Sequence, residues 1–303
     1  MNKQKALIIF SFFSIYVFWG STYLWNKIAV TELPPLMLAC VRFTTAGALI
    51  FIIAKAMGKS LAITKKQFLN CVIAGFLFLG FGNGVIVWAL RYVDSGFAAL
   101  EVSLQPLIIL LLMRIIQRKA IRSKSIIGIS LGILGMYLLI SQQELITKEG
   151  TIIGIIMIFI CMISWSIGSL FVAQADMPKN FFITTGYQMV TAGITLAISS
   201  YIFEETWLSP FQWQLDTQLS MICLVIFGSI AAFTSFNYLL KAVSTEKVAT
   251  SAYVNPIVAL VLGWHFLGED ITLQSFFAAV IILTGVYFIN SRKDKKIRLR
   301  KGN

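Results

Sequence analysis

The sequence predicts an all-α, polytopic membrane bundle of ten transmembrane helices, arranged as two inverted five-helix repeats. Three observations predict it. Of the 303 residues, 58% are hydrophobic and only 13% are charged, about half the charged share of a soluble domain. The apolar residues form blocks of about 20 separated by short polar clusters, and the blocks of the first half recur in the second. This composition excludes an ordinary soluble enzyme, a disordered chain and a small disulfide scaffold.

Each apolar block has the length that a helix needs to cross a bilayer, about 20 residues for about 30 Å. Helices are expected because an unclosed sheet would leave backbone groups unpaired in lipid. The first block is too long for the apolar region of a signal peptide and lacks a clear small-x-small cleavage site, so it is interpreted as a retained span. The expected spans cover residues 6–27, 34–57, 67–90, 96–116, 123–141, 150–174, 180–203, 218–240, 246–266 and 272–290.

The distribution of positive charge predicts the orientation. With a cytoplasmic N-terminus, the outer loops carry only Lys27, Arg91 and Lys148 of the 25 Lys and Arg residues. This asymmetry predicts that both termini are cytoplasmic in a multi-pass protein of the inner (cytoplasmic) membrane. Most of the net charge of +12 then comes from the cytoplasmic loops and tail, where it sets the orientation of the chain in the membrane. The basic tail at 292–301 is interpreted as an anchor to anionic membrane lipid, and no nucleic-acid partner is expected.

The two halves of the chain align with nearly constant offsets. Residues 91–112 (RYVDSGFAALEVSLQPLIILLL) align without gaps on residues 241–262 (KAVSTEKVATSAYVNPIVALVL), and a second offset pairs Trp19 with Trp165. The predicted units are residues 1–144 and 145–303, the second ending in the basic tail. Because each unit holds an odd number of spans, the second must enter the membrane from the opposite side, an arrangement typical of secondary transporters.

Several motifs resemble the EamA-type branch of the drug/metabolite transporter superfamily. They are WGSTYLWNK, VRFTTAGAL and WALRYVDSGFAALEVSLQP in the first half, and FLGEDITLQ followed by GVYF in the second. The resemblance covers residues 6–290. It implies a ten-helix fold of two inverted repeats and the movement of small metabolites such as amino acids. The first-half counterpart of the LGE motif lacks the acid, so a role for this motif rests only on Leu267, Gly268 and Glu269.

Cysteine and histidine usage argues against metal chemistry. Cys40, Cys71, Cys161 and Cys223 all lie within apolar blocks, and no two have metal-ligand spacing. His265 is the only histidine, so a conventional His/Cys metal centre cannot be built. No metal or cofactor is expected. The sequence also lacks a P-loop, so ATP is not expected to drive the protein directly.

Two ionisable residues, Arg42 and Glu101, lie clearly within expected spans, where each costs about 2.5–3.5 kcal/mol on insertion scales. Both are expected in the outer half of the membrane, at depths that differ by about one helical turn. Opposite charges at similar depth predict a pair. The pair either holds two spans together as a salt bridge or serves function, with Arg42 binding a substrate carboxylate or Glu101 exchanging a proton or binding an amine. A third reading has Arg42 snorkel toward the interface.

Polar and aromatic residues recur at helical spacing on other spans. Together with Arg42 and Glu101 they form the candidate substrate-binding set, since convergent amides and aromatics suit a zwitterion with an apolar side chain. For any single amide, hydrogen bonding between helices is the alternative. The other members of the set are Trp19, Tyr23, Asn83, Gln105, Trp165, Asn237, Ser251 and Asn255.

Three further features predict local structure. Pro106 and Pro256 fall at equivalent mid-span positions and are expected either to act as hinges or to form static kinks. Gln105 and Asn255, which precede them, are expected to bond the freed carbonyls. Glycines in the fifth span and Gly285 in the tenth predict packing or dimer faces. Glu269 is expected to cap the start of the tenth span near Thr272 rather than to bind substrate.

The sequence therefore favours a secondary transporter, an exporter of small metabolites that works by alternating access as a monomer or homodimer. A small-molecule substrate is expected, with protons as a candidate coupling ion. The alternative is an intramembrane enzyme acting on a lipid-linked substrate, which the near absence of clustered acids, histidines and nucleophile–base pairs disfavours. A non-transporting scaffold is disfavoured by the inverted repeat. Substrate identity and the direction of flux do not follow from the sequence.

Overall fold

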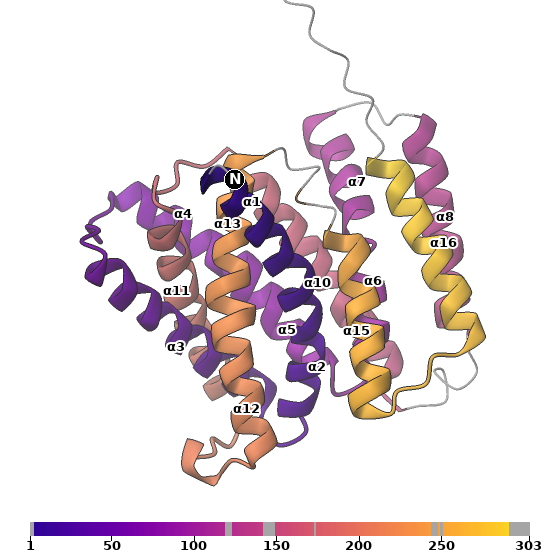
Figure 1. Ribbon diagram of the computed structural model, residues 1–303. Helices are drawn as coiled ribbons and strands as arrows, with labels where there is room; N and C mark the ends of the chain where they lie inside the picture. The colour runs from indigo at the N-terminus through magenta and orange to yellow at the C-terminus, as the bar shows by residue number, and fades with distance from the viewer. Residues whose placement is uncertain are drawn as a thin grey trace, which may run out of the picture.

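The computed structural model describes residues 3–118, 123–141, 149–172, 174–243, 248 and 251–290, and every regular element within them is helical (Figure 1). The first half contains α1 (Lys3–Phe13), the π-helical segment η1 (Ser14–Phe18), α2 (Trp19–Ala29), α3 (Pro35–Ala56), α4 (Lys65–Gly75), the π-helical segment η2 (Phe76–Asn83), α5 (Gly84–Ala89), α6 (Ser95–Val102), α7 (Gln105–Gln117) and α8 (Ser123–Ile140). The second half contains α10 (Thr151–Val172), α11 (Phe181–Ile202), the short helix η3 (Pro210–Gln212), α12 (Leu215–Cys223), the π-helical segment η4 (Leu224–Ala231), α13 (Ala232–Ala242), α15 (Ser251–Leu267) and α16 (Leu273–Asn290).

Within the described residues, seven helical stretches are long and apolar enough to cross a membrane, and their outward faces carry exposed residues such as Ile115, Ile153 and Ile198. The predicted all-helical architecture with several apolar helices of span length is therefore confirmed for the described residues. The count of ten crossings and the inverted repeat remain predictions. The seven long helices are Gln4–Ala29, Pro35–Ala56, Lys65–Ala89, Ser95–Ile116, Thr151–Val172, Phe181–Ile202 and Leu215–Leu240, and the shorter apolar ones are Ile126–Gly135, Val254–Leu267 and Leu273–Gly285.

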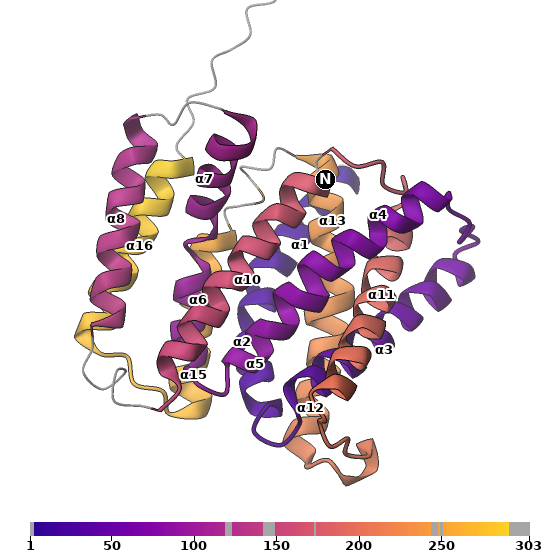
Figure 2. The same cartoon turned by 180° about the vertical axis from the view of Figure 1, so that it is seen from behind.

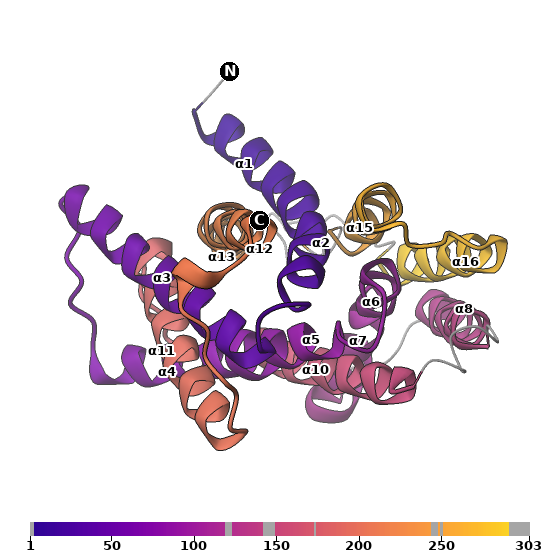
Figure 3. The same cartoon turned by 90° about the horizontal axis from the view of Figure 1, so that it is seen from below.

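Helix pairs from the two halves build the bundle. Along one side α3 packs on α11, and at the opposite edge α8 packs on α16 (Figure 3). A methyl group on Gly135 would lie 2.6 Å from Ile282 Cγ1, and one on Gly285 would lie 2.7 Å from the carbonyl oxygen of Gly128. Such close approach of backbones needs small residues. The predicted packing role of these glycines is confirmed, because α8 and α16 use them against each other.

Glu269 caps a different helix from the one predicted. Its carboxylate accepts hydrogen bonds from Ser95 N and Oγ, both at 2.8 Å, and from Gly96 N at 3.1 Å. These groups begin α6, so Glu269 stabilises the start of the fourth expected span. The start of α16 is capped by Thr272 itself, whose Oγ1 accepts from Ser275 N at 3.0 Å. The prediction was wrong because a cap is chosen by proximity in space, and α15 packs beside α6.

Two more carboxylates cap helices of the opposite half at the same end of the bundle. Glu205, after α11, accepts from Leu36 N at 3.0 Å and Met37 N at 2.8 Å, at the start of α3. Glu32, after α2, accepts from Gln214 N at the start of α12 with both oxygens at 3.1 Å. Unsatisfied N–H groups and the positive end of the helix dipole both favour a carboxylate there. These caps tie the halves together.

In the described part of the chain, three π-helical segments interrupt otherwise regular long helices in the centre of the bundle. Segment η1 lies between α1 and α2, η2 between α4 and α5, and η4 between α12 and α13. A π-helical turn re-aims the side chains that follow it and often accompanies a functional site. Segments η2 and η4 occupy corresponding stretches of the third and eighth expected spans. The hydrophobic pattern contained no sign of them.

Candidate functional site

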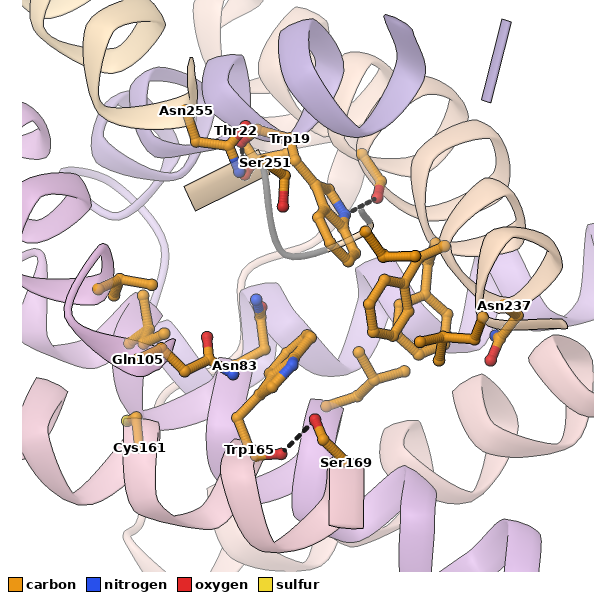
Figure 4. A pocket seen from close by; sticks show the side chains of 18 of the residues that line it. Trp19, Thr22, Asn83, Gln105, Cys161, Trp165, Ser169, Asn237, Ser251 and Asn255 are labelled. Atoms are coloured by element: carbon orange, nitrogen blue, oxygen red, sulfur yellow. Dashed lines mark hydrogen bonds between the residues drawn. The ribbon is translucent and has the colours of Figure 1, made fainter. Parts of the chain in front are cut away.

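A cavity of about 590 Å³ lies in the centre of the bundle, between helices of both halves. Figure 4 shows side chains from the two halves facing this common space. The cavity is lined by every member of the predicted site except Glu101: Trp19, Tyr23, Arg42, Asn83, Gln105, Trp165, Asn237, Ser251 and Asn255, together with Pro106 and Pro256.

One wall of the cavity is aromatic. The rings of Trp19 and Trp165 meet edge to face, with centroids 6.0 Å apart, and Trp19 also lies 5.0 Å from Phe236. Phe233 and Phe236 stack at 5.9 Å. The indole N–H of Trp19 donates to the carbonyl oxygen of Gly228 at 3.2 Å, which orients the ring. This wall offers a large, rigid apolar surface that can hold the apolar part of a ligand.

Arg42 lies in another part of the cavity wall and is only 3% exposed. Its Nε donates to Ser229 Oγ at 2.8 Å, while Nη1 faces the side-chain oxygens of Asn26 at 3.5 Å and Asn83 at 3.4 Å. All these partners are neutral. The side chain therefore crosses from α3 toward η4, η2 and α2, and does not snorkel to the membrane surface.

The predicted pairing of Arg42 with Glu101 is wrong. Glu101 is 1% exposed, and neither of its carboxylate oxygens has a hydrogen-bond partner among the described residues. It is also absent from the described cavity lining, so this geometry does not support its predicted contact with substrate. The physical reason is packing, because α3 lies against α11 and η4, whereas α6 lies against α15 and α10. Similar depth in a membrane does not make two helices neighbours.

Amides at the cavity also connect helices. Asn237 Nδ2 donates to Thr185 Oγ1 at 2.8 Å and to Gln188 Oε1 at 3.2 Å, which joins α13 to α11. With its amide nitrogen facing η1, Asn255 donates to the carbonyls of Ile15 and Tyr16, both at 2.9 Å. Asn255 therefore bonds carbonyls in η1, and the prediction that it bonds a carbonyl freed by Pro256 is wrong. For these amides the helix-joining role is observed.

The two prolines occupy different backbone settings. The helix that contains Pro106 is interrupted at Ser103 and Leu104, and α7 restarts with Pro106 in its first turn. Pro256, in contrast, lies inside α15. Pro106 therefore marks a break in the described helix, while both prolines line the cavity. Whether either acts as a hinge stays a prediction.

The cavity wall extends to one end of the bundle and stops short of the other. Asp176 and Phe181, where α10 ends and α11 begins, belong to the lining. Asp176 accepts at its backbone carbonyl from Asn70 Nδ2 of α4 at 2.9 Å, so this is the end at which α4 starts (Figure 2). At the opposite end, Leu33 and Leu90 are fully buried and lie outside the lining. No residue of the connections at 30–34, 90–94 and 203–214 belongs to the lining, so the described cavity does not reach that end.

Comparison with known proteins identifies the family. A model of the EamA-like transporter family matches residues 6–141 and 152–291. The chain belongs to this family. The inner membrane transporter YedA of Escherichia coli (strain K12), described as uncharacterized, is 34% identical over 295 residues, which cover 97% of this chain and 94% of YedA.

Other EamA-like relatives are more distant. A probable amino-acid metabolite efflux pump of Escherichia coli (strain K12) is 25% identical over 288 residues and covers 90% of this chain and 91% of that protein. The uncharacterized transporter YoaV of Bacillus subtilis (strain 168) is 20% identical over 92% of this chain and 95% of its own length. A solved crystal structure superposes with a TM-score of 0.67 at 19% identity, covering 94% of this chain and 96% of that one, which shows a shared fold.

Sequence reasoning missed several residues in or beside the cavity of this EamA-family protein. Ser229, the closest partner of Arg42, and Gly228 lie in η4, and a π-helical segment leaves no mark in the apolar pattern. Phe233 and Phe236 were overlooked because aromatic residues in an apolar span read as lipid-facing or core positions. A usable signal was their i, i+3 spacing on the same span as Asn237, which places all three near one helix face.

Proposed function

We propose that this EamA-family protein is a secondary transporter that exports small organic metabolites across the inner membrane by alternating access. The observation that carries the proposal is the central cavity, which is built jointly by Trp19 and Trp165 at matching places in the two halves and reaches only one end of the bundle. A cavity closed at one end is what one state of an alternating-access carrier requires.

We further propose that all ten helical stretches cross the membrane and that the two halves are inverted relative to each other. The family model matches one stretch in each half. The contacts of α3 with α11 and of α8 with α16 join elements that correspond between the halves, as an inverted repeat would. In Figure 1 the chain enters α1 at the end of the bundle where α10 finishes, so the first helices of the two halves run in opposite directions.

We propose that the end of the bundle reached by the cavity, where α10 ends and α11 begins, faces the cytoplasm. Lys55, Lys59, Lys65 and Lys66 flank the connection between α3 and α4 at that end, and positive charge accumulates on the cytoplasmic side of membrane proteins. The state described is then inward-facing. Export would follow when the halves rock so that the opposite end opens, driven by a gradient of protons or of the substrate itself.

Transport is favoured over intramembrane catalysis by the chemistry of the cavity. Its described lining carries only Tyr23, Arg42, Cys161 and Asp176 as ionisable side chains. The single histidine, His265, is outside that lining, so Cys161 has no imidazole base there. A hydrolase or transferase would need a nucleophile with an adjacent base, or clustered acids. The relatives are named as transporters and as a probable efflux pump, which agrees with this choice.

The proposal is tested by counterflow in proteoliposomes. Vesicles holding the purified protein are loaded with a mixture of unlabelled amino acids and organic acids, then diluted into medium with trace amounts of the labelled compounds. A carrier should accumulate label transiently, protein-free vesicles should not, and chromatography should recover the label unchanged. A superimposed pH gradient shows whether protons are coupled. Chemically altered label, or no accumulation of any compound, would contradict transport.

A further inference from the structure

The cavity holds a buried positive charge without a matching negative one. Arg42 is only 3% exposed. It donates hydrogen bonds to the side-chain oxygens of Ser229, Asn26 and Asn83. Its Nη2 has no hydrogen-bond partner among the described residues, although it approaches the backbone at Gly228. A guanidinium carries five N–H donors in a planar fork that suits a carboxylate.

No acid in the described part of the wall can neutralise this charge. Glu101 makes no hydrogen bond to it and lies outside the lining. The other charged residue of the described lining, Asp176, is at the open end, beside α4. A charge removed from water without a counter-ion is strongly unfavourable, so the binding of an anion here is correspondingly favoured.

The aromatic wall limits what can accompany the anion. Trp19, Trp165, Phe233 and Phe236 contribute ring edges and faces with hardly any polar groups, and the indole N–H of Trp19 is already used by Gly228. A ligand that places its anionic group on Arg42 would therefore rest its body against rings. Burial of an apolar or aromatic body of that kind is favourable.

We propose that the preferred substrates are organic monocarboxylates with an apolar body, taken in preference to the zwitterionic amino acid of the same skeleton. The inference rests on the proposed function, because it assumes that the cavity is the transport route. An α-ammonium group lies next to its own carboxylate. It would therefore enter the neighbourhood of the Arg42 guanidinium without a side-chain carboxylate to pair with it. Neutral oxygens of Asn26 and Asn83 are already turned toward Arg42.

The first experiment compares four probes of one skeleton on the purified, unchanged protein: 3-phenylpropionate, phenylalanine, 3-phenylpropanamide and phenethylamine. Binding is followed by quenching of tryptophan fluorescence, at constant pH and ionic strength. The expected order of affinity is propionate, then phenylalanine, then amide, then amine, with about 10- to 100-fold between propionate and amide, the value of one hydrogen-bonded charge. Equal affinities, tighter binding of phenylalanine than of propionate, or no binding of any probe would overturn the proposal.

The second experiment uses Arg42→Gln. The matched control is Arg91→Gln, which removes the same positive charge from an exposed position. Arg42→Gln should abolish the preference for propionate over amide and keep amide binding within about threefold, while the control keeps the full order. Retention of the preference in a folded Arg42→Gln protein would overturn the assignment. If that variant does not fold, Arg42→Lys takes its place. Lysine keeps the positive charge but lacks the planar guanidinium donors, so propionate affinity should fall less than it would in Arg42→Gln.

Failure of this inference and failure of the proposed function give different results. In the counterflow assay, transport of phenylalanine with no preference for propionate would leave the transporter proposal intact and reject the monocarboxylate assignment. Arg42-dependent binding of propionate without any counterflow would reject transport and retain the anion site.

Discussion

Trp19 and Trp165 come from equivalent places in the two halves and meet edge to face in the cavity, with ring centroids 6.0 Å apart. Each also touches Phe236, at 5.0 Å and 6.3 Å respectively. The contact joins α2 to α10, so any rocking of one half against the other must change it. The two rings are therefore both a wall of the candidate site and a contact between the halves.

Replacement of either tryptophan should reduce transport more than it reduces the amount of folded protein. We expect Trp165→Ala to lower the affinity for an apolar substrate by about tenfold, equivalent to about 1.4 kcal/mol, because the ligand loses part of its aromatic wall. Trp165→Phe should retain most of the affinity. Counterflow and thermal unfolding in detergent provide the measurements. Trp207→Ala is the control, since that indole lies outside the cavity lining. An unchanged affinity in folded Trp165→Ala would remove Trp165 from the site.

Arg42 and Glu101 should act independently in a double-mutant cycle. Because they make no direct hydrogen bond, the effects of Arg42→Gln and Glu101→Gln on thermal stability should add to within about 0.5 kcal/mol. Glu101→Leu alone should raise stability by about 1 kcal/mol, since it removes buried polar atoms that have no hydrogen-bond partner among the described residues. A coupling energy of several kcal/mol would show that the two charges pair in the membrane after all.

Loss of the Glu269 cap should destabilise the start of α6. Glu269→Ala removes the acceptor of three hydrogen bonds donated by Ser95 and Gly96. The free energy of unfolding should fall by about 0.5–2 kcal/mol, as it does when other helix caps are lost. The neighbouring Asp270→Ala serves as the control because its side chain is exposed and caps no described helix. Thermal unfolding of both variants tests the prediction. Equal stability of the two would mean that the cap contributes nothing measurable.

Accessibility to an impermeant thiol reagent should distinguish the two ends of the bundle. A cysteine at Gln212, in η3, should be labelled from outside intact cells, whereas a cysteine at Lys65, at the start of α4, should react only after the membrane is opened. Both positions are exposed, so a lack of reaction reflects location. The parent protein, with its four native cysteines, measures background. The reverse pattern would invert the proposed orientation.

Much of the candidate site could be predicted from residue type and helical spacing. Polar residues such as Asn83 and Asn237 in apolar spans are costly unless they meet a partner or a cavity, and both line the central space. Trp19 and Trp165 were predicted from their helical spacing to neighbouring polar residues and from their matched positions in the two halves. These predictions needed only a strong local constraint and no knowledge of which helices touch.

The sequence by itself determined that the chain is a bundle of apolar helices in a membrane, because lipid cannot satisfy backbone groups and so leaves helices as the solution. It also determined which residues are too polar to face lipid. Only the tertiary structure decided their partners. Arg42 binds Ser229 instead of Glu101, and Glu269 caps α6 instead of α16. The reason is that a hydrogen bond depends on a few tenths of an ångström between atoms distant in the chain. The π-helical turns and helix contacts that set those distances are absent from the periodicity of any single segment.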